Sequence, residues 1–320
     1  MARPPRYVPQ DSSRRRVWIY LAVVAFILAD ALLISWALGA RTADTVTESA
    51  SPIPTFTPVQ ATSTPSPEAS VVAIPSTRLL SALDDATAWR ATTGECPIAS
   101  AKPELSTDAG LTWESTDATG DVQVASLQSI QVVNETVVEM VGLSVADCSP
   151  QFVRSFVAGD DYADYPALLA GEWYVDPADR SVVHTPAGDE TAPCASVVAL
   201  SARTDEDGAA AVLCSDTNVY TTRDVAETWG SPVQIPGAVN LAVTTMGYVV
   251  ATIGLPECAG VQLVALSEEA PLPNPTGCLP VTIPSETLPG NVAVSEAAGT
   301  LWVWVSDEIK RSRDEGATWQ

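Results

Sequence analysis

An eight-residue pattern occurs three times in this chain, each time at the end of a segment that we expect to form a β-strand. Residues 106–113 and 312–319 both read Ser-x-Asp-x-Gly-x-Thr-Trp, and residues 222–229 repeat the pattern with Thr at the first position and Ala226 in place of the glycine. An Asp carboxylate accepts backbone N–H bonds within a turn, and Gly supplies the positive φ of a tight hairpin. The pattern therefore predicts repeated β-hairpins, each followed by a Trp that covers the edge of a sheet.

The side chains that we expect to shape these hairpins are equivalent in the three copies. They are Ser106, Asp108, Gly110, Thr112 and Trp113; Thr222, Asp224, Thr228 and Trp229; and Ser312, Asp314, Gly316, Thr318 and Trp319. At the corresponding places of two other repeats, residues 158–162 and 267–269 lack most of the pattern.

The hairpins belong to a longer repeat with a spacing of roughly 45–65 residues, a period typical of propeller blades. In each repeat an apolar strand, a turn and a second apolar strand precede a third strand. The strand pairs cover residues 79–83 with 87–92, 129–133 with 136–142, 196–202 with 209–215, 240–245 with 248–253, and 291–295 with 300–306. Such units predict an all-β chain that forms a β-propeller of about five blades, with a short sixth blade near residues 173–185 as the alternative.

The three hairpins resemble the Asp boxes, or BNR repeats, of sialidases, sortilin-type receptors and photosystem assembly propellers. The resemblance covers residues 71–320. In those families the boxes are structural and lie away from the binding face. The resemblance therefore implies a fold and leaves the ligand open.

The N-terminal region predicts a membrane anchor. Five arginines lie within residues 1–16, and residues 17–40 form an apolar run that contains only one ionisable residue, Asp30. About 24 residues suffice to cross the hydrocarbon core as a helix, and the arginines predict a cytoplasmic N-terminus. We expect a basic cytoplasmic tail (1–16) and a transmembrane signal-anchor helix (17–40). The alternative is a signal peptide cleaved near Ala37-Leu38-Gly39.

The remainder of the chain is expected to lie outside the cell membrane. Residues 41–70 are rich in Pro, Ser and Thr and predict an extended linker, and residues 71–320 form the propeller domain. The net charge of −23 excludes nucleic acid as a partner, because phosphate binding needs a basic surface. The single histidine, His184, argues against a His-based metal cluster or catalytic triad.

The six cysteines all follow the apolar run, as expected of a disulfide-bonded domain in an oxidising compartment. Six cysteines allow fifteen pairings, and the strand register favours one of them. We predict the pairs Cys194–Cys214, Cys258–Cys278 and Cys96–Cys148.

The turns between second and third strands each carry an acidic residue. These residues are Glu95, Asp147, Asp216, Glu257 and Asp307. A ring of carboxylates around the axis would hold Ca²⁺ or a cationic ligand. The alternative is that they merely belong to an acid-rich surface, in which case the chain binds no cofactor.

The last hairpin lies next to Gln320, so the final blade lacks an outer strand. We expect residues 71–75 to supply this strand and close the ring, because propellers avoid an exposed sheet edge. The alternative is that this segment is only the end of the linker.

For function, these features favour a membrane-anchored, extracytoplasmic binding or scaffold module for a protein or glycan, without catalytic residues. A purely structural role in envelope assembly is a second candidate. The alternative from another class is a sialidase-like glycoside hydrolase. The Phe/Tyr-Arg-Ile-Pro motif of that family is absent, and Arg78, Arg90 and Arg154 follow no matching pattern.

Overall fold

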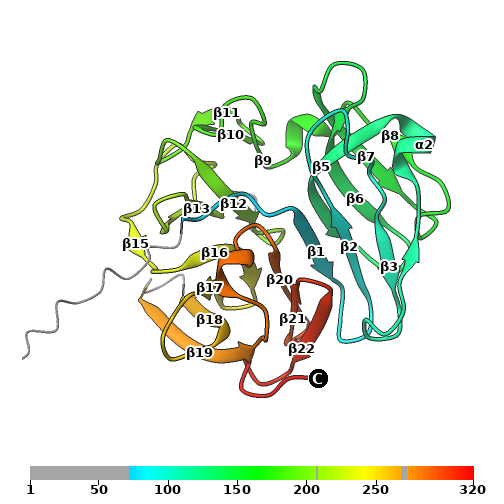
Figure 1. Ribbon diagram of the computed structural model, residues 1–320. Coiled ribbons are helices and arrows are strands. Elements are labelled where there is room, and N and C mark those ends of the chain that lie inside the picture. The colour runs from blue at the N-terminus through cyan, green and yellow to red at the C-terminus, as the bar shows by residue number, and fades with distance from the viewer. Residues whose placement is uncertain (1–71, 207, 268–271) are drawn as a thin grey trace, which may run out of the picture. The chain divides into compact units, whose positions relative to one another are not determined.

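The computed structural model describes residues 72–206, 208–267 and 272–320, which form six antiparallel sheets arranged as blades around a common axis (Figure 1). The predicted all-β propeller is confirmed. It has six blades, which was the alternative count. The predicted membrane span, 17–40, lies outside the described residues, and within the described part of the chain no helix is long and apolar enough to cross a membrane.

Blades 1, 2, 4 and 5 have four strands in the described residues, and blades 3 and 6 have three. Blade 1 contains β1 (Arg78–Ala82), β2 (Ala88–Thr92), β3 (Glu104–Ser106) and β4 (Glu114–Ser115). Blade 2 contains β5 (Val124–Val132), β6 (Val138–Ser144), β7 (Pro150–Ser155) and β8 (Ala163–Asp164), and blade 3 contains β9 (Tyr174–Val175), β10 (Val182–Thr185) and β11 (Gly188–Thr191). Blade 4 contains β12 (Val197–Ala202), β13 (Ala210–Cys214), β14 (Asn218–Thr222) and β15 (Val233–Gln234). Blade 5 contains β16 (Ala238–Thr244), β17 (Gly247–Ile253), β18 (Gly260–Ser267) and β19 (Pro273–Pro280), and blade 6 contains β20 (Val292–Ala297), β21 (Thr300–Val305) and β22 (Glu308–Ser312).

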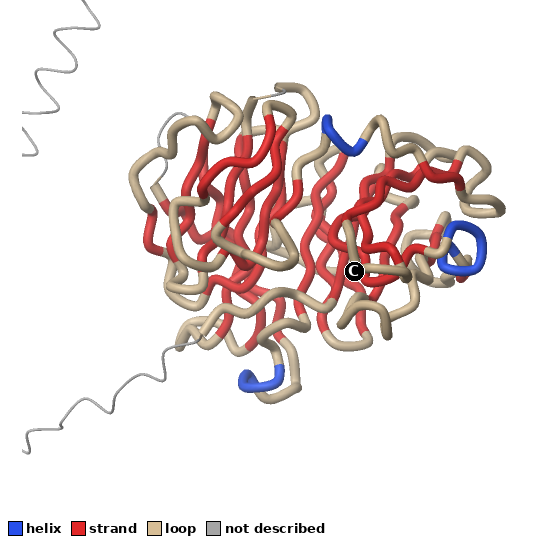
Figure 2. The backbone as a smooth tube through the Cα atoms, turned by 90° about the horizontal axis from the view of Figure 1, so that it is seen from above, coloured by secondary structure: helices blue, strands red, loops and turns tan. Residues whose placement is uncertain are grey.

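Helical structure in the described residues is limited to short turns, as Figure 2 shows. These are α2 (Ala118–Val122), η1 (Leu169–Gly171) and η2 (Ser285–Thr287). The second strands β17 and β21 are buried at every position, because each lies in the middle of a blade with neighbouring blades on both faces. A strand buried on both faces reads as a continuous apolar run, and Thr-Leu-Trp-Val-Trp-Val of β21 is such a run.

The inner strands of neighbouring blades are joined by a recurring serine. In three places a Ser hydroxyl on one inner strand accepts a backbone N–H from the next inner strand at 3.0 Å. The pairs are Ser81 with Val132, Ser201 with Val243, and Ser295 with Ala82. These bonds link blades 1 and 2, 4 and 5, and 6 and 1, next to the axis.

The segment before β1 does not close blade 6, so the expectation for residues 71–75 is wrong for the described part, 72–75. It forms no strand and instead crosses one mouth of the ring (Figure 1). Ala73 is buried among side chains of blades 4 and 5, and Thr77 donates its N–H and hydroxyl to Gly290 O at 2.8 and 2.9 Å. The edge of β22 pairs with Gln320, which exchanges two backbone hydrogen bonds with Arg311.

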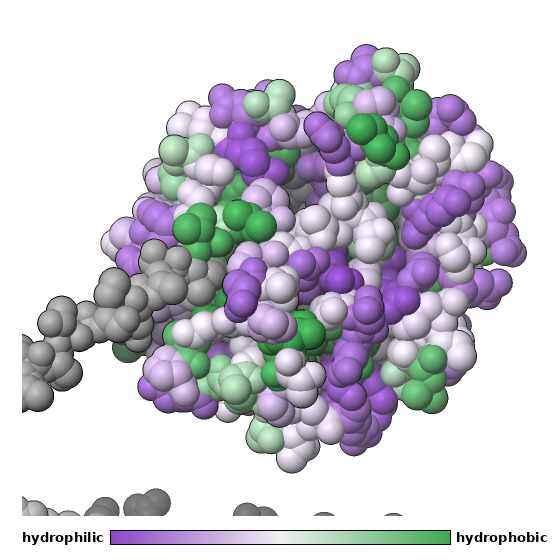
Figure 3. Space-filling model, in the orientation of Figure 1, coloured by the Kyte–Doolittle hydropathy of each residue, from purple (hydrophilic) through white to green (hydrophobic). Residues whose placement is uncertain are grey.

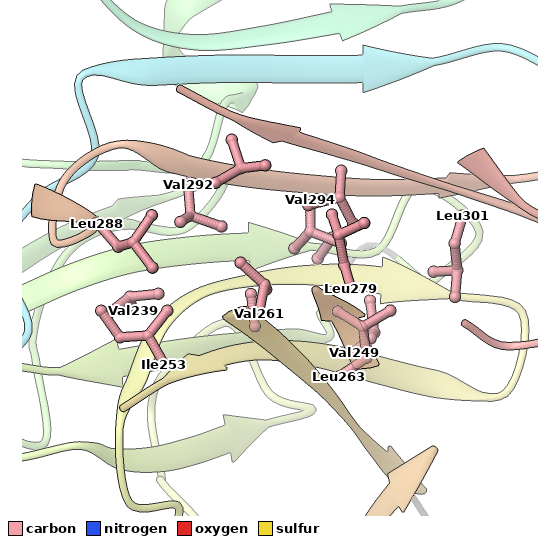
Figure 4. Close-up of a cluster of buried hydrophobic side chains, with 14 residues drawn as sticks. Val239, Val249, Ile253, Val261, Leu263, Leu279, Leu288, Val292, Val294 and Leu301 are labelled. Atoms are coloured by element: carbon pink, nitrogen blue, oxygen red, sulfur yellow. The ribbon is translucent and has the colours of Figure 1, made fainter. Parts of the chain in front are cut away.

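The core is divided among the seams, by which we mean the interfaces between neighbouring blades. Separate clusters of buried apolar side chains join blades 1 and 2, 3 and 4, 4 and 5, 5 and 6, and 6 and 1. The cluster between blades 5 and 6 includes Val249, Leu263, Val294 and Leu301 (Figure 4). No cluster of this kind among the described residues joins blades 2 and 3.

The predicted disulfide pairing is confirmed. Cys96–Cys148 connects blades 1 and 2, while Cys194–Cys214 and Cys258–Cys278 lie within blades 4 and 5. Their Cα atoms are 6.0, 6.2 and 5.8 Å apart, as expected for disulfides. The strand register therefore sufficed to choose among the pairings.

Candidate ligand channel and open seam

The inner strands surround a central channel with a volume of about 970 Å³. Residues from all six blades line it, together with Pro75, Ser76 and Thr77 of the segment that crosses its mouth. Its charged lining residues are of both signs: Arg78, Arg180, Arg203, Glu139, Glu172 and Glu296. A polar channel of this size is suited to hold part of a ligand rather than to serve as a packed core.

The channel also reaches outward between blades 2 and 3. Glu139 lies on β6, the second strand of blade 2, and Pro186 lies between β10 and β11 of blade 3, yet both line the cavity. Figure 3 shows a recess between the surfaces of these two blades, with hydrophobic side chains over blade 2 beside it. We call the interface between blades 2 and 3 the open seam.

The wall of the open seam on blade 2 follows from strand alternation. Met140 and Val153 point into the apolar cluster with blade 1, so Glu139 and Arg154 point the other way. These two residues are register partners on β6 and β7 and form an ion pair. The Arg154 guanidinium lies 5.4–5.9 Å from three aromatic ring centres, and its Nε is buried without a hydrogen-bond partner. The rings are Phe152, Phe156 and Tyr165.

The wall on blade 3 also carries aromatic and ionisable side chains. Val175 and Val183 point into the cluster with blade 4, so Tyr174 and His184 point toward blade 2. The Tyr174 and His184 rings are stacked with centres 4.6 Å apart. His184 Nδ1 lies 2.6 Å from Asp189 Oδ1, and His184 Nε2 is buried without a partner.

Glu172 lies between the two walls, two residues before the start of β9. Burial, with a smaller contribution from the Glu139 carboxylate, raises the pKa of Glu172 to about 6, and the Arg154 guanidinium opposes the shift. Among the described residues its carboxylate has no hydrogen-bond or ion-pair partner. A half-buried acid of this kind in a cavity is typical of a functional site.

The three predicted hairpins share one hydrogen-bond arrangement. In each, the Asp carboxylate accepts the N–H and the hydroxyl of the Thr four residues later, at 2.6–3.0 Å. These bonds lower the pKa values of Asp108, Asp224 and Asp314. The first Ser or Thr accepts the N–H of the fourth residue after it, which is Gly110, Ala226 or Gly316. All three lie at exposed turns outside the channel.

Sequence reasoning missed part of the equivalent turn in blade 2. Ser155 Oγ accepts the Gly159 N–H at 2.9 Å, as the first residue of each predicted hairpin does. Val157 stands where the Asp would be, and Tyr162 stands in place of the Trp. The Ser-x-x-x-Gly spacing followed by an aromatic residue was the available signal.

The aromatic side chains of three of these four turns bond to the preceding blade, whereas Trp113 Nε1 donates to Gly110 O of its own turn at 3.1 Å. Trp319 Nε1 donates to Cys278 O at 2.9 Å, and Trp229 Nε1 donates to Thr191 O at 3.2 Å. Tyr162 in blade 2 makes an equivalent 2.7 Å bond to Thr116 in blade 1. Blade 3 has no such turn in the described structure, so no aromatic residue ties it to blade 2 in this way.

The five predicted cation ligands are not brought together. Glu95, Asp147, Asp216, Glu257 and Asp307 are exposed on turns of five different blades, and none lines the channel. Asp147 and Asp216 instead accept hydrogen bonds within their own turns, from Ser149 and Asn218. In the described ranges no group of three or more His, Cys, Asp or Glu side chains is placed to hold a metal ion.

Comparison with known proteins returns solved structures only. No protein-family model and no curated protein matches the chain. YCF48 bound to a D1 peptide is 17% identical over 78% of this chain and 68% of its own, with a TM-score of 0.30. PorZ of Porphyromonas gingivalis is 9% identical over 78% of this chain and 33% of its own, with a TM-score of 0.40.

A GH74 xyloglucanase from Xanthomonas campestris is 15% identical over 76% of this chain and 37% of its own, with a TM-score of 0.31. The chain therefore spans about a third of the length of PorZ and of the xyloglucanase. The chain is a six-bladed β-propeller whose central channel opens sideways between blades 2 and 3.

Proposed function

We propose that this chain is a membrane-anchored, extracytoplasmic binding module whose ligand occupies the central channel and the open seam. The observation that carries the proposal is the contrast between seams. Apolar clusters join five pairs of neighbouring blades, and between blades 2 and 3 the described residues place charged and aromatic side chains around a cavity. Folding stability alone favours an apolar interface here.

Unsatisfied polar atoms support the assignment of a binding site. Arg154 Nε and His184 Nε2 are buried without partners, and the half-buried Glu172 carboxylate has none among the described residues. Buried polar groups in folded proteins are normally paired. Of these three residues Glu172 lines the cavity, so we expect its carboxylate to meet a ligand. All three lie on the walls of the open seam.

The location rests on the sequence and on the disulfides. Disulfides are rare in a reducing cytosol, so the three disulfides favour an extracytoplasmic propeller. The arginines of residues 1–16 and the apolar run 17–40 support a cytoplasmic tail and an anchor, with 41–70 as linker. Protease added to intact cells should therefore remove the propeller and leave the tail protected. Protection of the whole chain would contradict this orientation.

Site-directed photo-cross-linking tests the binding function in the full chain. A photoreactive phenylalanine analogue at Phe156 lies in the open seam, and the same analogue at Leu111, which is 83% exposed, lies on the turn of a predicted hairpin. We expect discrete adducts from position 156 in native membranes and none from position 111. Equal labelling at both positions, or none at either, would contradict a ligand in the seam.

A second candidate function is glycoside hydrolysis, and one observation favours it. Glu139 and Glu172 are two acidic residues at one cavity, and the pKa of Glu172 is raised to about 6, as for a general acid. A panel of fluorogenic glycosides, sialosides included, tests this with the full chain and with Glu172→Gln. Turnover that the substitution abolishes would support an enzyme. Absence of turnover on the whole panel supports the binding module.

A further inference from the structure

We infer that the open seam binds an extended segment of a partner protein in which a Lys or Arg side chain neighbours an aromatic or aliphatic one. This inference rests on the proposed binding function and assigns its ligand class. It follows from the apolar surface, the charge and the shape of the seam.

The outer part of the seam exposes apolar side chains that a neighbouring blade would normally cover. Phe156 is 50% exposed and Leu168 is 38% exposed. The Phe156 ring contacts Tyr165 edge-on, with ring centres 6.0 Å apart. These residues lie on blade 2 and on the connection to blade 3, where no apolar cluster joins the two blades. Covering them requires an aromatic or aliphatic group from outside the ring.

The charge of the seam favours a ligand that carries a positive charge. Its acidic residues are Glu139, Glu172 and Asp189, and its basic residues are Arg154 and His184. Arg154 forms an ion pair with Glu139, and His184 contacts Asp189. The Asp189 side chain is 68% exposed. Glu172 is left over as a half-buried carboxylate without a partner. A ligand ammonium or guanidinium at this carboxylate complements the excess negative charge.

The shape of the seam favours an extended chain. Glu139 and Glu172 line the channel, and Arg154, the ion-pair partner of Glu139, lies 5.4 Å from the centre of the half-exposed Phe156 ring. Contacts along blade 2 therefore run from the channel to the exposed ring. Successive side chains of an extended peptide point to opposite sides, which lets one residue reach Glu172 while its neighbour covers Phe156.

Fluorescence anisotropy with three labelled heptapeptides tests the ligand class on the full chain in detergent micelles. The first probe alternates Lys and Phe, the second replaces Lys by Glu, and the third replaces Phe by Gly. We expect the first probe to bind about tenfold or more tightly than either of the others, because the second loses the charge pair and the third the apolar contact. Binding that does not discriminate Lys from Glu would overturn the inference.

Two substitutions and a matched control locate the binding. Glu172→Gln keeps the size of the side chain and should weaken the Lys–Phe probe about tenfold, and Phe156→Ser should weaken it several-fold. Glu135→Gln alters an exposed acid on the same blade and should leave affinity within about twofold. An unchanged affinity in Glu172→Gln would mean that the probe binds elsewhere, and the inference would fail.

The outcomes separate this inference from the proposed function. Adducts at position 156 in membranes without probe discrimination would leave the binding module standing and refute the ligand class. A change of oligomeric state in Phe156→Ser, measured by mass photometry, would assign the seam to a second copy of this chain instead. Binding of an amino-sugar oligomer in place of the peptide would likewise overturn the assignment of a protein partner.

Discussion

The seam between blades 5 and 6 is filled by apolar side chains, whereas the seam between blades 2 and 3 is lined by charged and aromatic ones. Blades 5 and 6 interlock through fourteen buried apolar residues (Figure 4). Gly277 allows the outer strand β19 to approach the turn at Gly316. Blades 2 and 3 face each other with Glu139, Arg154, Tyr174 and other polar or aromatic side chains around an extension of the channel.

This difference shows which part of the ring carries stability and which part is available for function. Apolar burial supplies most of the folding free energy, so a seam without it is held mainly by its neighbours. Blade 2 is fixed from the side of blade 1, by an apolar cluster and by Cys96–Cys148. Blade 3 is fixed from the side of blade 4. The interface between them remains adaptable, as a binding site requires.

The largest effect is expected from the disulfide that holds blade 2. Cys96 and Cys148 are 52 residues apart, and Cys258 and Cys278 are 20 apart. Chain entropy predicts that replacing the first pair by Ala lowers the free energy of unfolding by about 4 kcal/mol and the second by about 3 kcal/mol. Urea denaturation of the full chain measures both. A larger loss for the second pair would contradict the dependence of blade 2 on blade 1.

Truncating one side chain in each seam compares how much the two seams contribute to stability. Leu263→Ala removes a fully buried side chain between blades 5 and 6 and should cost about 2–5 kcal/mol of unfolding free energy. Phe156→Ala removes a half-exposed side chain from the open seam and should cost less than about 1 kcal/mol. Similar losses, measured by urea denaturation, would show that the two seams are equally closed.

The rim bonds give a smaller effect. Trp319→Phe keeps an aromatic ring but removes the hydrogen bond to Cys278 O, and should cost about 1 kcal/mol in the same assay. Trp229→Phe, which removes the bond to Thr191 O, serves as the matched variant on blade 4. If both substitutions leave the urea midpoint unchanged, the aromatic residues do not hold neighbouring blades together.

The smallest effect is expected from Glu172→Gln, which should raise the stability of the protein at high pH. Glu172 binds its proton more tightly in the folded protein than in the unfolded chain, because its pKa is raised to about 6. Its favourable contribution is present at low pH and is lost as pH rises through about 6. Glu172→Gln should therefore match the wild type at pH 4 and exceed its stability at pH 8 by less than about 1 kcal/mol. A wild type that is more stable at pH 8 would contradict an unpaired carboxylate.

The hairpins and disulfides could be predicted because their determinants are close in the sequence or are fixed by strand register. Blade 3 was harder to find, since β9 has two residues and Gly-Asp-Glu-Thr of β11 has no apolar alternation. The predicted carboxylate ring failed for a geometric reason. Equivalent turns share a register, but the acidic residue of each turn is exposed, and none of the five lines the channel.

The walls of the open seam come from segments that the fold brings together. Glu139 and Arg154 become partners only through the register of β6 and β7, and Glu172 joins them from the next connection. One signal was present: Glu139 interrupts an otherwise apolar second strand, and a basic residue occupies the adjoining third strand. Without the order of blades around the axis, this pair could not be assigned to a cavity.

Hydrogen-exchange mass spectrometry of the full chain can show whether the ring is open between blades 2 and 3, because amide protection reports the local free energy of opening. We predict that the amide hydrogens of β7 and β10, on the two sides of the open seam, exchange on the order of tenfold or more faster than those of β17 and β21. The strands β17 and β21 flank the seam between blades 5 and 6. Equal protection of these strands would contradict the claim that the ring is open between blades 2 and 3.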